Sequence, residues 1–283
     1  MMKSLKIKIF PVLIFAALSS CTERIDLPLD ESSFRLVVEG EVTTDTAAHS
    51  VYLTKSTSYY YNQVPPVVTG ASVNITDGEN VYELLEEEPG IYRTSSDFHG
   101  VEGLTYTLNI KLSSPLGGFT EYTASSVIAS LVTLDSVTLQ YFPEYGDMGL
   151  WEVKCSLLDS PLADFYRFEL YRNKHLITHK LSKWQVTDDT FFNGLYASGI
   201  LVDYLDQSSD NEKLVSGDTL TVELNSISRE YYSFIQDAQS ELRGSNPLFS
   251  GPGANVKGNI SNGAIGFFAA YPVSRAYAIV RNP

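Results

Sequence analysis

The chain has 283 residues, of which 43% are hydrophobic and 12% aromatic, and its formal net charge is −14. This content of apolar residues is enough to form packed cores and excludes an intrinsically disordered chain. The acidic balance excludes nucleic acid as a partner, because the phosphate backbone repels a negatively charged surface.

The first twenty residues have the organisation of an export signal. Three lysines precede the apolar run Ile9–Leu18, which is too short to span a bilayer. Small residues then lead to Cys21, an order that resembles the lipobox of bacterial lipoproteins, in which cleavage leaves the cysteine as an acylated N-terminus. We expect residues 1–20 to be a signal peptide and Cys21 to carry palmitate or a related acyl chain. An ordinary secretory signal with an incidental cysteine is the alternative.

Residues 21–33 are polar and interrupted by proline, which is typical of a tether between a lipid and a folded body. Residues 34–129 then carry short apolar runs with alternation or β-branched residues, separated by Gly, Pro, Asp and Asn. Their number and spacing predict an immunoglobulin-like β-sandwich. The predicted strands are Phe34–Val42, Ser50–Lys55, Ala71–Thr76, Val81–Leu85, Gly90–Thr94, Leu104–Leu112 and Thr120–Ile128.

Residues 130–283 predict a second β-rich domain. One segment near residues 228–243 has apolar residues at helical spacing, a serine that can cap its start and Gly244 to end it, and it predicts the one substantial helix. The fold class is therefore mostly β. The predicted strands are Val132–Phe142, Leu150–Leu158, Phe165–Arg172, Leu176–Lys180, Lys183–Val186, Thr219–Leu224, Gly258–Ile260, Ala264–Tyr271 and Ala276–Val280.

Catalytic and cofactor-binding motifs are absent from the sequence, so we expect no enzyme activity, no cofactor and no metal. His175 and His179 are four residues apart, but in a strand this spacing separates them by about 13 Å, too far for a shared metal ion. Cys155 shares one face of a predicted strand with Trp151 and Val153, which indicates a buried apolar role.

Two stretches are candidates for contacts. The acidic residues Asp203, Asp206 and Asp210 are interpreted as a solvated loop, with binding of an ion such as calcium as the alternative. The aromatic run Tyr59, Tyr60 and Tyr61 lies in a predicted loop, where exposed rings are typical of partner contacts. Packing of these rings back onto the domain's own sheet is the alternative.

Several stretches together resemble the Bacteroidota lipoproteins grouped as domain-of-unknown-function family 4249, over essentially the whole mature chain. Members are typically encoded beside TonB-dependent outer-membrane receptors, so the resemblance implies a lipoprotein that works with such a receptor. The acidic residues Glu23 and Asp26 resemble the surface-export tag of that phylum, although Arg24 interrupts them. The stretches that carry the resemblance are Phe34–Gly40, Val67–Asp77, Gly90–Arg93, Pro252–Ile260 and Gly263–Phe268.

The expected function is that of an outer-membrane lipoprotein, lipid-anchored and facing the cell surface, that is the accessory binding partner of a TonB-dependent receptor in nutrient uptake. A structural or adhesive surface protein with immunoglobulin-like modules is the first alternative, and a surface hydrolase is the second. The sequence does not identify the cargo, the leaflet or the oligomeric state.

Overall fold

The computed structural model describes residues 34–57, 64–243 and 256–281. The signal peptide, the tether, Cys21 and the tyrosines Tyr59, Tyr60 and Tyr61 lie outside the described residues, and their predicted roles stay predictions. Within the described residues the chain forms sixteen strands, one α-helix and one short 3-10 helix. The predicted mostly β class with one substantial helix is therefore confirmed, whereas the immunoglobulin-like topology stays a prediction.

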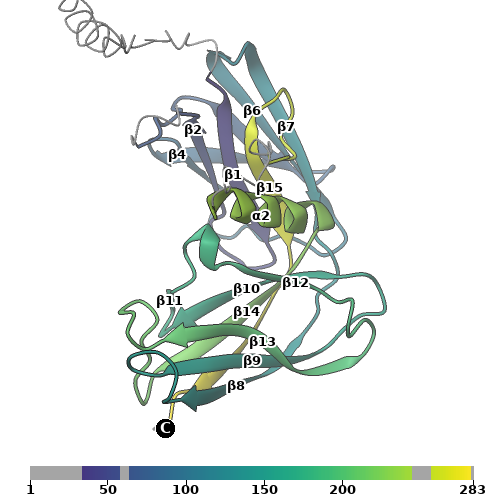
Figure 1. Ribbon diagram of the computed structural model, residues 1–283. Helices are drawn as coiled ribbons and strands as arrows, with labels where there is room; N and C mark the ends of the chain where they lie inside the picture. The colour runs from purple at the N-terminus through teal and green to yellow at the C-terminus, as the bar shows by residue number, and fades with distance from the viewer. Residues whose placement is uncertain (1–33, 58–63, 244–255, 282–283) are drawn as a thin grey trace, which may run out of the picture. The chain divides into compact units, whose positions relative to one another are not determined.

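Eight strands form the first sheet, in the order β15-β1-β2-β5-β4-β3-β6-β7 (Figure 1). In β1 the alternate side chains of Leu36, Val38 and Val42 are buried in the core of this sheet, so Glu39 and Glu41 project from its outer face. The strands are β1 Leu36–Thr43, β2 Ser50–Lys55, β3 Ser72–Thr76, β4 Val81–Glu88, β5 Ile91–Arg93, β6 Thr105–Leu116, β7 Phe119–Val127 and β15 Ile265–Tyr271.

Strand β15 comes from near the end of the sequence but is the parallel neighbour of β1, with Gly266 opposite Val38. Gly266 has a φ of +106°, and a Cβ at this position would lie 1.9 Å from the Val38 carbonyl oxygen, so only glycine fits. The strand at the opposite edge of the sheet, β7, also contacts β15, because the backbone N of Ala270 in β15 donates to Ser126 Oγ in β7 at 2.9 Å. The sheet therefore curves around its core. A strand that lies after residue 130 thus belongs to the first sheet, and the division of the chain at that residue stays a prediction.

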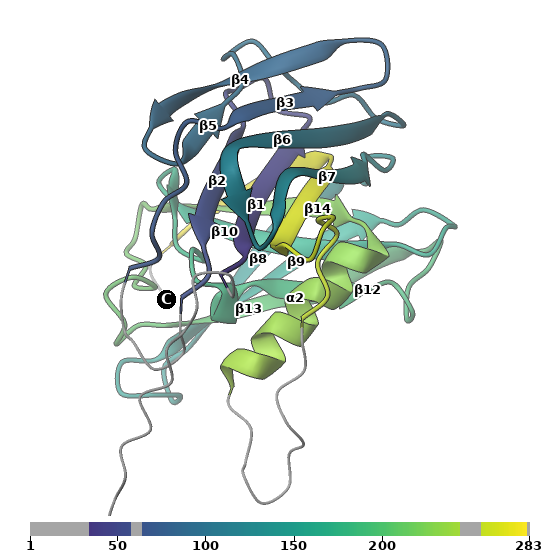
Figure 2. The same cartoon turned by 90° about the horizontal axis from the view of Figure 1, so that it is seen from above.

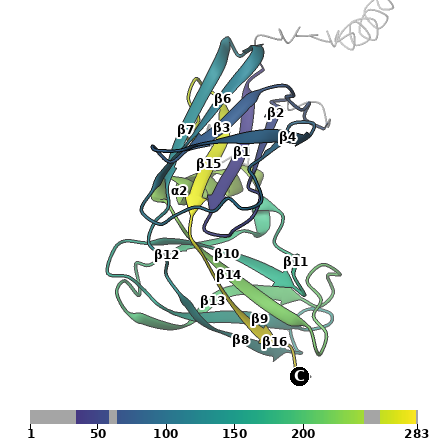
Figure 3. The ribbon, with the colours of Figure 1, turned by 180° about the vertical axis from the view of Figure 1, so that it is seen from behind.

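Two smaller sheets enclose a second core. One has the order β11-β10-β14-β16, with β12 also paired to β10, and the other has the order β13-β9-β8. Tyr166, Phe168 and Leu170 of β10 are buried in this core together with Trp151 and Cys155 of β9. The strands are β8 Leu134–Phe142, β9 Leu150–Leu158, β10 Phe165–Arg172, β11 His175–Leu176, β12 Gln185–Asp188, β13 Tyr196–Asp206, β14 Thr219–Ile227 and β16 Val273–Ile279. Figure 3 shows the chain passing from β15 in the first sheet directly into β16 in the second.

Helix α2, Arg229–Leu242, begins at Ser228, whose Oγ accepts a hydrogen bond from the backbone N of Tyr231 at 3.1 Å. The buried side chains of Tyr231 and Ile235 pack against Phe267 of β15 in a third, smaller core. Figure 2 shows α2 beside β15. The helix therefore covers part of the outer face of the first sheet.

Two strand predictions are wrong. Only Leu176 of the predicted strand Leu176–Lys180 lies in a strand, β11, so the strand spacing assumed between His175 and His179 does not hold. Residues 258–260 form no strand, because the side chain of Asn259 takes the place of a backbone partner of β15. The backbone N of Phe268 donates to Asn259 Oδ1 at 2.9 Å, and Asn259 Nδ2 donates to the Phe268 carbonyl oxygen at 2.7 Å.

The sequence analysis also missed β13. Its register to β9 shifts twice, between Ser198 and Ile200 and between Leu201 and Asp203, and such bulges remove the alternation that indicates a strand.

Candidate functional site

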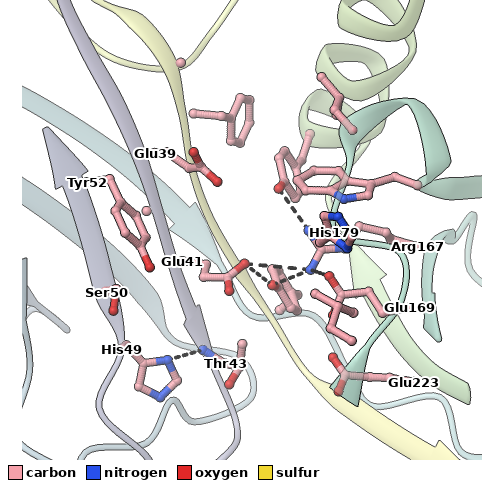
Figure 4. A pocket seen from close by; sticks show the side chains of 18 of the residues that line it. Glu39, Glu41, Thr43, His49, Ser50, Tyr52, Arg167, Glu169, His179 and Glu223 are labelled. Carbon is pink, nitrogen blue, oxygen red and sulfur yellow. Dashed lines mark hydrogen bonds and ion pairs between the residues drawn. The ribbon is translucent and has the colours of Figure 1, made fainter. Parts of the chain in front are cut away.

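A cavity of about 830 Å³ lies between the outer face of the first sheet and the outer face of the sheet that contains β10, β14 and β16 (Figure 4). Strands β1, β2 and β15 line one side of it. One flank is closed by α2 and by the segment around the 3-10 helix η2, Leu181–Lys183, which contribute Phe234 and Trp184. The volume is within the range of pockets that bind small molecules, about 300–1,000 Å³.

The β1 side of the cavity presents a carboxylate between two aromatic rings. Glu39 is paired with Phe267 of β15 on one side and with Tyr52 of β2 on the other, so the three side chains stand in a row on the outer face. Phe267 is held by α2, because its ring centroid lies 4.8 Å from that of Tyr231 and 5.2 Å from that of Phe234. Tyr52 is 41% exposed.

Arg167 projects from β10 on the opposite side of the cavity and is only 2% exposed. Its Nε donates to Asn225 Oδ1 at 3.1 Å, its Nη1 to the Tyr231 hydroxyl at 3.1 Å and its Nη2 to the Tyr271 hydroxyl at 2.6 Å. These partners belong to β14, α2 and β15. One guanidinium group therefore joins the second sheet, the helix and the first sheet.

Aromatic rings surround the Arg167 guanidinium. Its central carbon lies 4.8 Å from the ring centroid of Trp184, 4.9 Å from that of Tyr271 and 5.7 Å from that of Tyr231. Cation–π attraction strengthens as water is removed, so these rings stabilise the buried charge. Aromatic rings in the wall of the cavity therefore already surround one organic cation, the guanidinium group of Arg167.

Two carboxylates balance Arg167. Its Nη2 lies 3.1 Å from Glu169 Oε1 and 3.7 Å from Glu41 Oε2. The Tyr171 hydroxyl donates to Glu169 Oε2 at 2.9 Å, and the Tyr271 hydroxyl donates to Glu41. Burial raises the pKa of Glu169, whereas Arg167 lowers it. Both carboxylates are therefore held by protein partners.

Arg275 of β16 forms the second ion-paired group. Its Nε donates to Glu223 Oε2 at 2.8 Å, and its Nη1 donates to Asp45 Oδ1 at 2.9 Å. Asn225 Nδ2 donates to the other oxygen of Glu223 at 2.9 Å. The hydrogen bond from Arg275 lowers the pKa of Asp45. Since Asp45 follows β1, this pair is a second link between the two sheets.

His49 has no ring nitrogen left for acid–base chemistry. The backbone N of Thr43 donates to its Nδ1 at 3.2 Å, and its Nε2 donates to the Asp45 carbonyl oxygen at 3.1 Å. Burial lowers the pKa of His49, which favours the neutral ring that this pattern requires. The imidazole therefore fixes the turn between β1 and β2.

Glu39 differs from every other carboxylate that lines the cavity, because it makes no hydrogen bond or ion pair with the described residues. The side chain of Glu39 is exposed on the cavity side of β1. Partial desolvation by the surrounding protein raises the pKa of Glu39, and the nearby Glu41 raises it further, while Arg167 lowers it. Figure 4 shows Glu39 and Glu41 projecting from β1 into the space that Arg167 faces. An unpaired carboxylate beside aromatic rings can bind a cation.

A separate group of carboxylates lies outside the cavity. Asp159, Asp164 and Asp189 are, among the described residues, the one set of acidic groups whose oxygens lie within 4.8 Å of one another. Protein donors already engage them, since both oxygens of Asp159 accept, from the Tyr166 hydroxyl and from the backbone N of Gly194. The backbone N of Asp164 donates to Asp189 Oδ2 at 2.9 Å. The set orders the loops around it, and nothing further in the described residues identifies it as a metal centre.

The structure tests two of the sequence-based interpretations. Cys155 is buried as predicted, and burial raises its pKa to about 12, which makes the thiol unreactive. The acidic stretch is not one loop, because Asp203 and Asp206 belong to β13 and only Asp210 lies in the turn that follows. Asp203 is half-buried, and burial raises its pKa to about 6.

The sequence analysis missed all the charged residues of the cavity. Arg167 and Glu169 alternate with buried residues of β10, and Glu39 and Glu41 do the same in β1. This pattern is ordinary for a strand with one face in water. The sequence does show that β1 and β10 each carry charged residues at consecutive outward positions. It does not show that the outward faces of these two strands lie against each other.

Among the described residues, no helix is both long and apolar enough to cross a bilayer. No curated protein matches the chain. The family model described as a domain of unknown function, DUF4249, matches residues 22–276, which is nearly the whole chain and agrees with the resemblance seen in the sequence. The chain therefore belongs to the DUF4249 family.

Proposed function

We propose that this protein is a lipid-anchored binding protein of the outer-membrane surface, which acts as the accessory partner of a TonB-dependent receptor in nutrient uptake and has no catalysis of its own. The observation that carries this proposal is the cavity between the two sheets, with its buried, ion-paired wall and its unpaired Glu39. Such a preformed, charged cavity is suited to holding a ligand.

The arrangement of charged groups favours binding over catalysis. Arg167 and Arg275 are each fixed by two carboxylates, and the ring nitrogens of His49 are engaged with the backbone. A general base must reach a substrate proton, and a nucleophile needs such a base beside it. The carboxylates and guanidinium groups that line the cavity, with the exception of Glu39, are instead engaged in ion pairs with one another.

The membrane and receptor parts of the proposal are supported by the lipobox-like sequence that ends at Cys21 and by membership of the DUF4249 family. An acyl anchor confines a protein to the membrane plane, which raises its effective concentration at a neighbouring receptor. A weak interface with the receptor is then sufficient.

The test is a detergent-solubilised pull-down from native outer membranes, with bound proteins identified by mass spectrometry. Acylation is measured separately by the incorporation of labelled palmitate. We expect the wild-type chain to be palmitoylated and to copurify with a TonB-dependent receptor. Cys21→Ala should lose the palmitate label and leave the membrane fraction. Cys155→Ala, which removes the chain's other cysteine, should keep the label and stay in the membrane fraction.

Membrane retention of Cys21→Ala would contradict the anchor. A wild-type protein that is lipidated but copurifies with no receptor would contradict the accessory role and favour the structural or adhesive alternative.

A further inference from the structure

We propose that the cavity binds an organic cation, an ammonium or guanidinium group on an aliphatic chain, with Glu39 as its counterion and Tyr52 and Phe267 as the flanking rings. The proposal rests on the binding function above and defines the chemical class of the ligand. It is carried by the geometry of the β1 face of the cavity and by the balance of charges around it.

Glu39 is the one lining carboxylate without a hydrogen-bond or ion-pair partner among the described residues. Glu41 and Glu169 share Arg167, and Asp45 and Glu223 share Arg275. Glu39 is exposed to the solvent in the cavity, so a cationic ligand can reach its carboxylate without displacing a protein partner. The unpaired carboxylate is therefore available to pair with a positive charge on a ligand.

The lining of the cavity carries a net negative charge. Five carboxylates and two guanidinium groups line the cavity, and the lining contains no lysine. Even with both lining histidines, His49 and His179, counted as charged, the negative groups remain in excess. The chain as a whole carries a net charge of −14, so its field also attracts cations and repels anions.

The surroundings of Glu39 favour an organic cation over a metal ion. Divalent metal ions require several oxygens that converge on one point. In the part of the chain that the structure describes, the only carboxylates that converge in this way are Asp159, Asp164 and Asp189, away from the cavity. The neighbours of Glu39 are rings instead, and rings stabilise ammonium and guanidinium groups through cation–π contacts.

The protein itself contains an example of this recognition. The guanidinium of Arg167 lies 4.8 Å from the Trp184 ring and 4.9 Å from the Tyr271 ring while it contacts Glu169. Glu39 between Tyr52 and Phe267 repeats the combination of carboxylate and rings but lacks the cation. At about 830 Å³ the cavity also has room for the chain that carries the charged group.

The experiment is isothermal titration calorimetry of the full mature chain in detergent with three capped tripeptides, Ala-Lys-Ala, Ala-Gln-Ala and Ala-Glu-Ala. Capping removes the terminal charges, so the peptides differ only in the central side chain. We expect the lysine peptide to bind and the other two to bind at least about tenfold more weakly. Equal affinities for the lysine and glutamine peptides, or no binding of the lysine peptide, would overturn the proposal.

A fourth titration, with n-butylamine, distinguishes two sources of the cation. Binding of the amine with an affinity similar to that of the peptide indicates a free amine as ligand. Binding of the peptide alone indicates a basic side chain of a polypeptide. Either result supports the cation class.

Variants locate the site. Glu39→Gln keeps the size of the side chain and breaks no hydrogen bond or ion pair with the described residues, so the fold should be retained. We expect it to weaken binding of the lysine peptide by about tenfold or more. Glu83→Gln is the matched control, since Glu83 is an exposed carboxylate of β4 in the same sheet and outside the cavity.

Unchanged affinity in Glu39→Gln, or equal losses in the two variants, would overturn the assignment. The outcome is independent of receptor copurification. Failure of the peptide titration with an intact receptor complex therefore rejects the ligand class alone, and the reverse result rejects the accessory role alone.

Discussion

Replacement of Arg167 by methionine tests whether the ion-paired wall of the cavity holds the two sheets together. Methionine retains most of the length of the arginine side chain but carries no charge and no hydrogen-bond donor. The change removes the donors to Asn225, Tyr231 and Tyr271 and leaves Glu169 without its cation.

The expected loss follows from the burial of the pair. The side chains of Arg167 and Glu169 are only 2% and 11% exposed, so neither charge is stabilised by water. Removing one member of a buried ion pair typically costs about 3–5 kcal/mol, because the other charge is left uncompensated. Against a total stability of about 5–15 kcal/mol for a folded domain, Arg167→Met should remain folded with a much lower free energy of unfolding.

The pH dependence of this loss has a definite sign. Arg167 lowers the pKa of Glu169, and burial already raises it, so removal of Arg167 moves the pKa of Glu169 further above that of the unfolded chain. The penalty for the lone carboxylate is then present at neutral pH and disappears as the pH falls and Glu169 takes up a proton. The deficit of Arg167→Met should therefore be largest near pH 7 and smaller at pH 4.

Urea unfolding followed by circular dichroism measures both effects, and Arg167→Met/Glu169→Gln is the matched control. We expect the second substitution to restore part of the stability, since it removes the uncompensated charge. A loss below about 1 kcal/mol at pH 7, or a double variant less stable than the single one, would refute the reasoning.

Two further predictions concern single positions. Burial raises the pKa of Asp203 to about 6, above about 3.9 in an unfolded chain, so Asp203 should contribute a loss of stability as the pH rises from 4 to 7. Asp203→Asn should remove this loss and be about 2 kcal/mol more stable than the wild type at pH 8 but equal to it at pH 4 in thermal unfolding; parallel pH curves would contradict this. Gly266→Ala should abolish folding or lower the melting temperature severely, because its Cβ would lie 1.9 Å from the Val38 carbonyl oxygen. Gly263→Ala, with a φ of +70° and no atom within 4 Å of its Cβ, should cost only about 1–2 kcal/mol, and equal melting temperatures for the two variants would contradict the reasoning.

The strands of the first sheet were predictable because their physical cause is local. Ser50–Lys55 was predicted with the bounds that the structure has, since its residues suit a half-buried strand and turn-forming residues flank it. Helix α2 was predictable for the same reason, from the spacing of its apolar residues and from Ser228 at its start. Strand β13 was not, because two bulges interrupt its alternation.

The site could not be predicted because it depends on contacts between distant parts of the chain. Glu39 and Phe267 become neighbours only through the pairing of β1 with β15, more than 220 residues away in sequence. Arg167 looks like a residue on a solvent-facing strand position until Tyr231 and Tyr271 cover it. A single sequence contains no local pattern that indicates which sheet faces and which helix pack against each other. Each of these positions is typical of a strand at the protein surface.

The most direct test of the account is a crystal structure of the protein grown with the capped Ala-Lys-Ala peptide. The account predicts electron density for the lysine ammonium within hydrogen-bond distance, about 2.7–3.2 Å, of a Glu39 carboxylate oxygen and between the rings of Tyr52 and Phe267. Density for the ammonium at another surface, with the space beside Glu39 filled only by water, would contradict it.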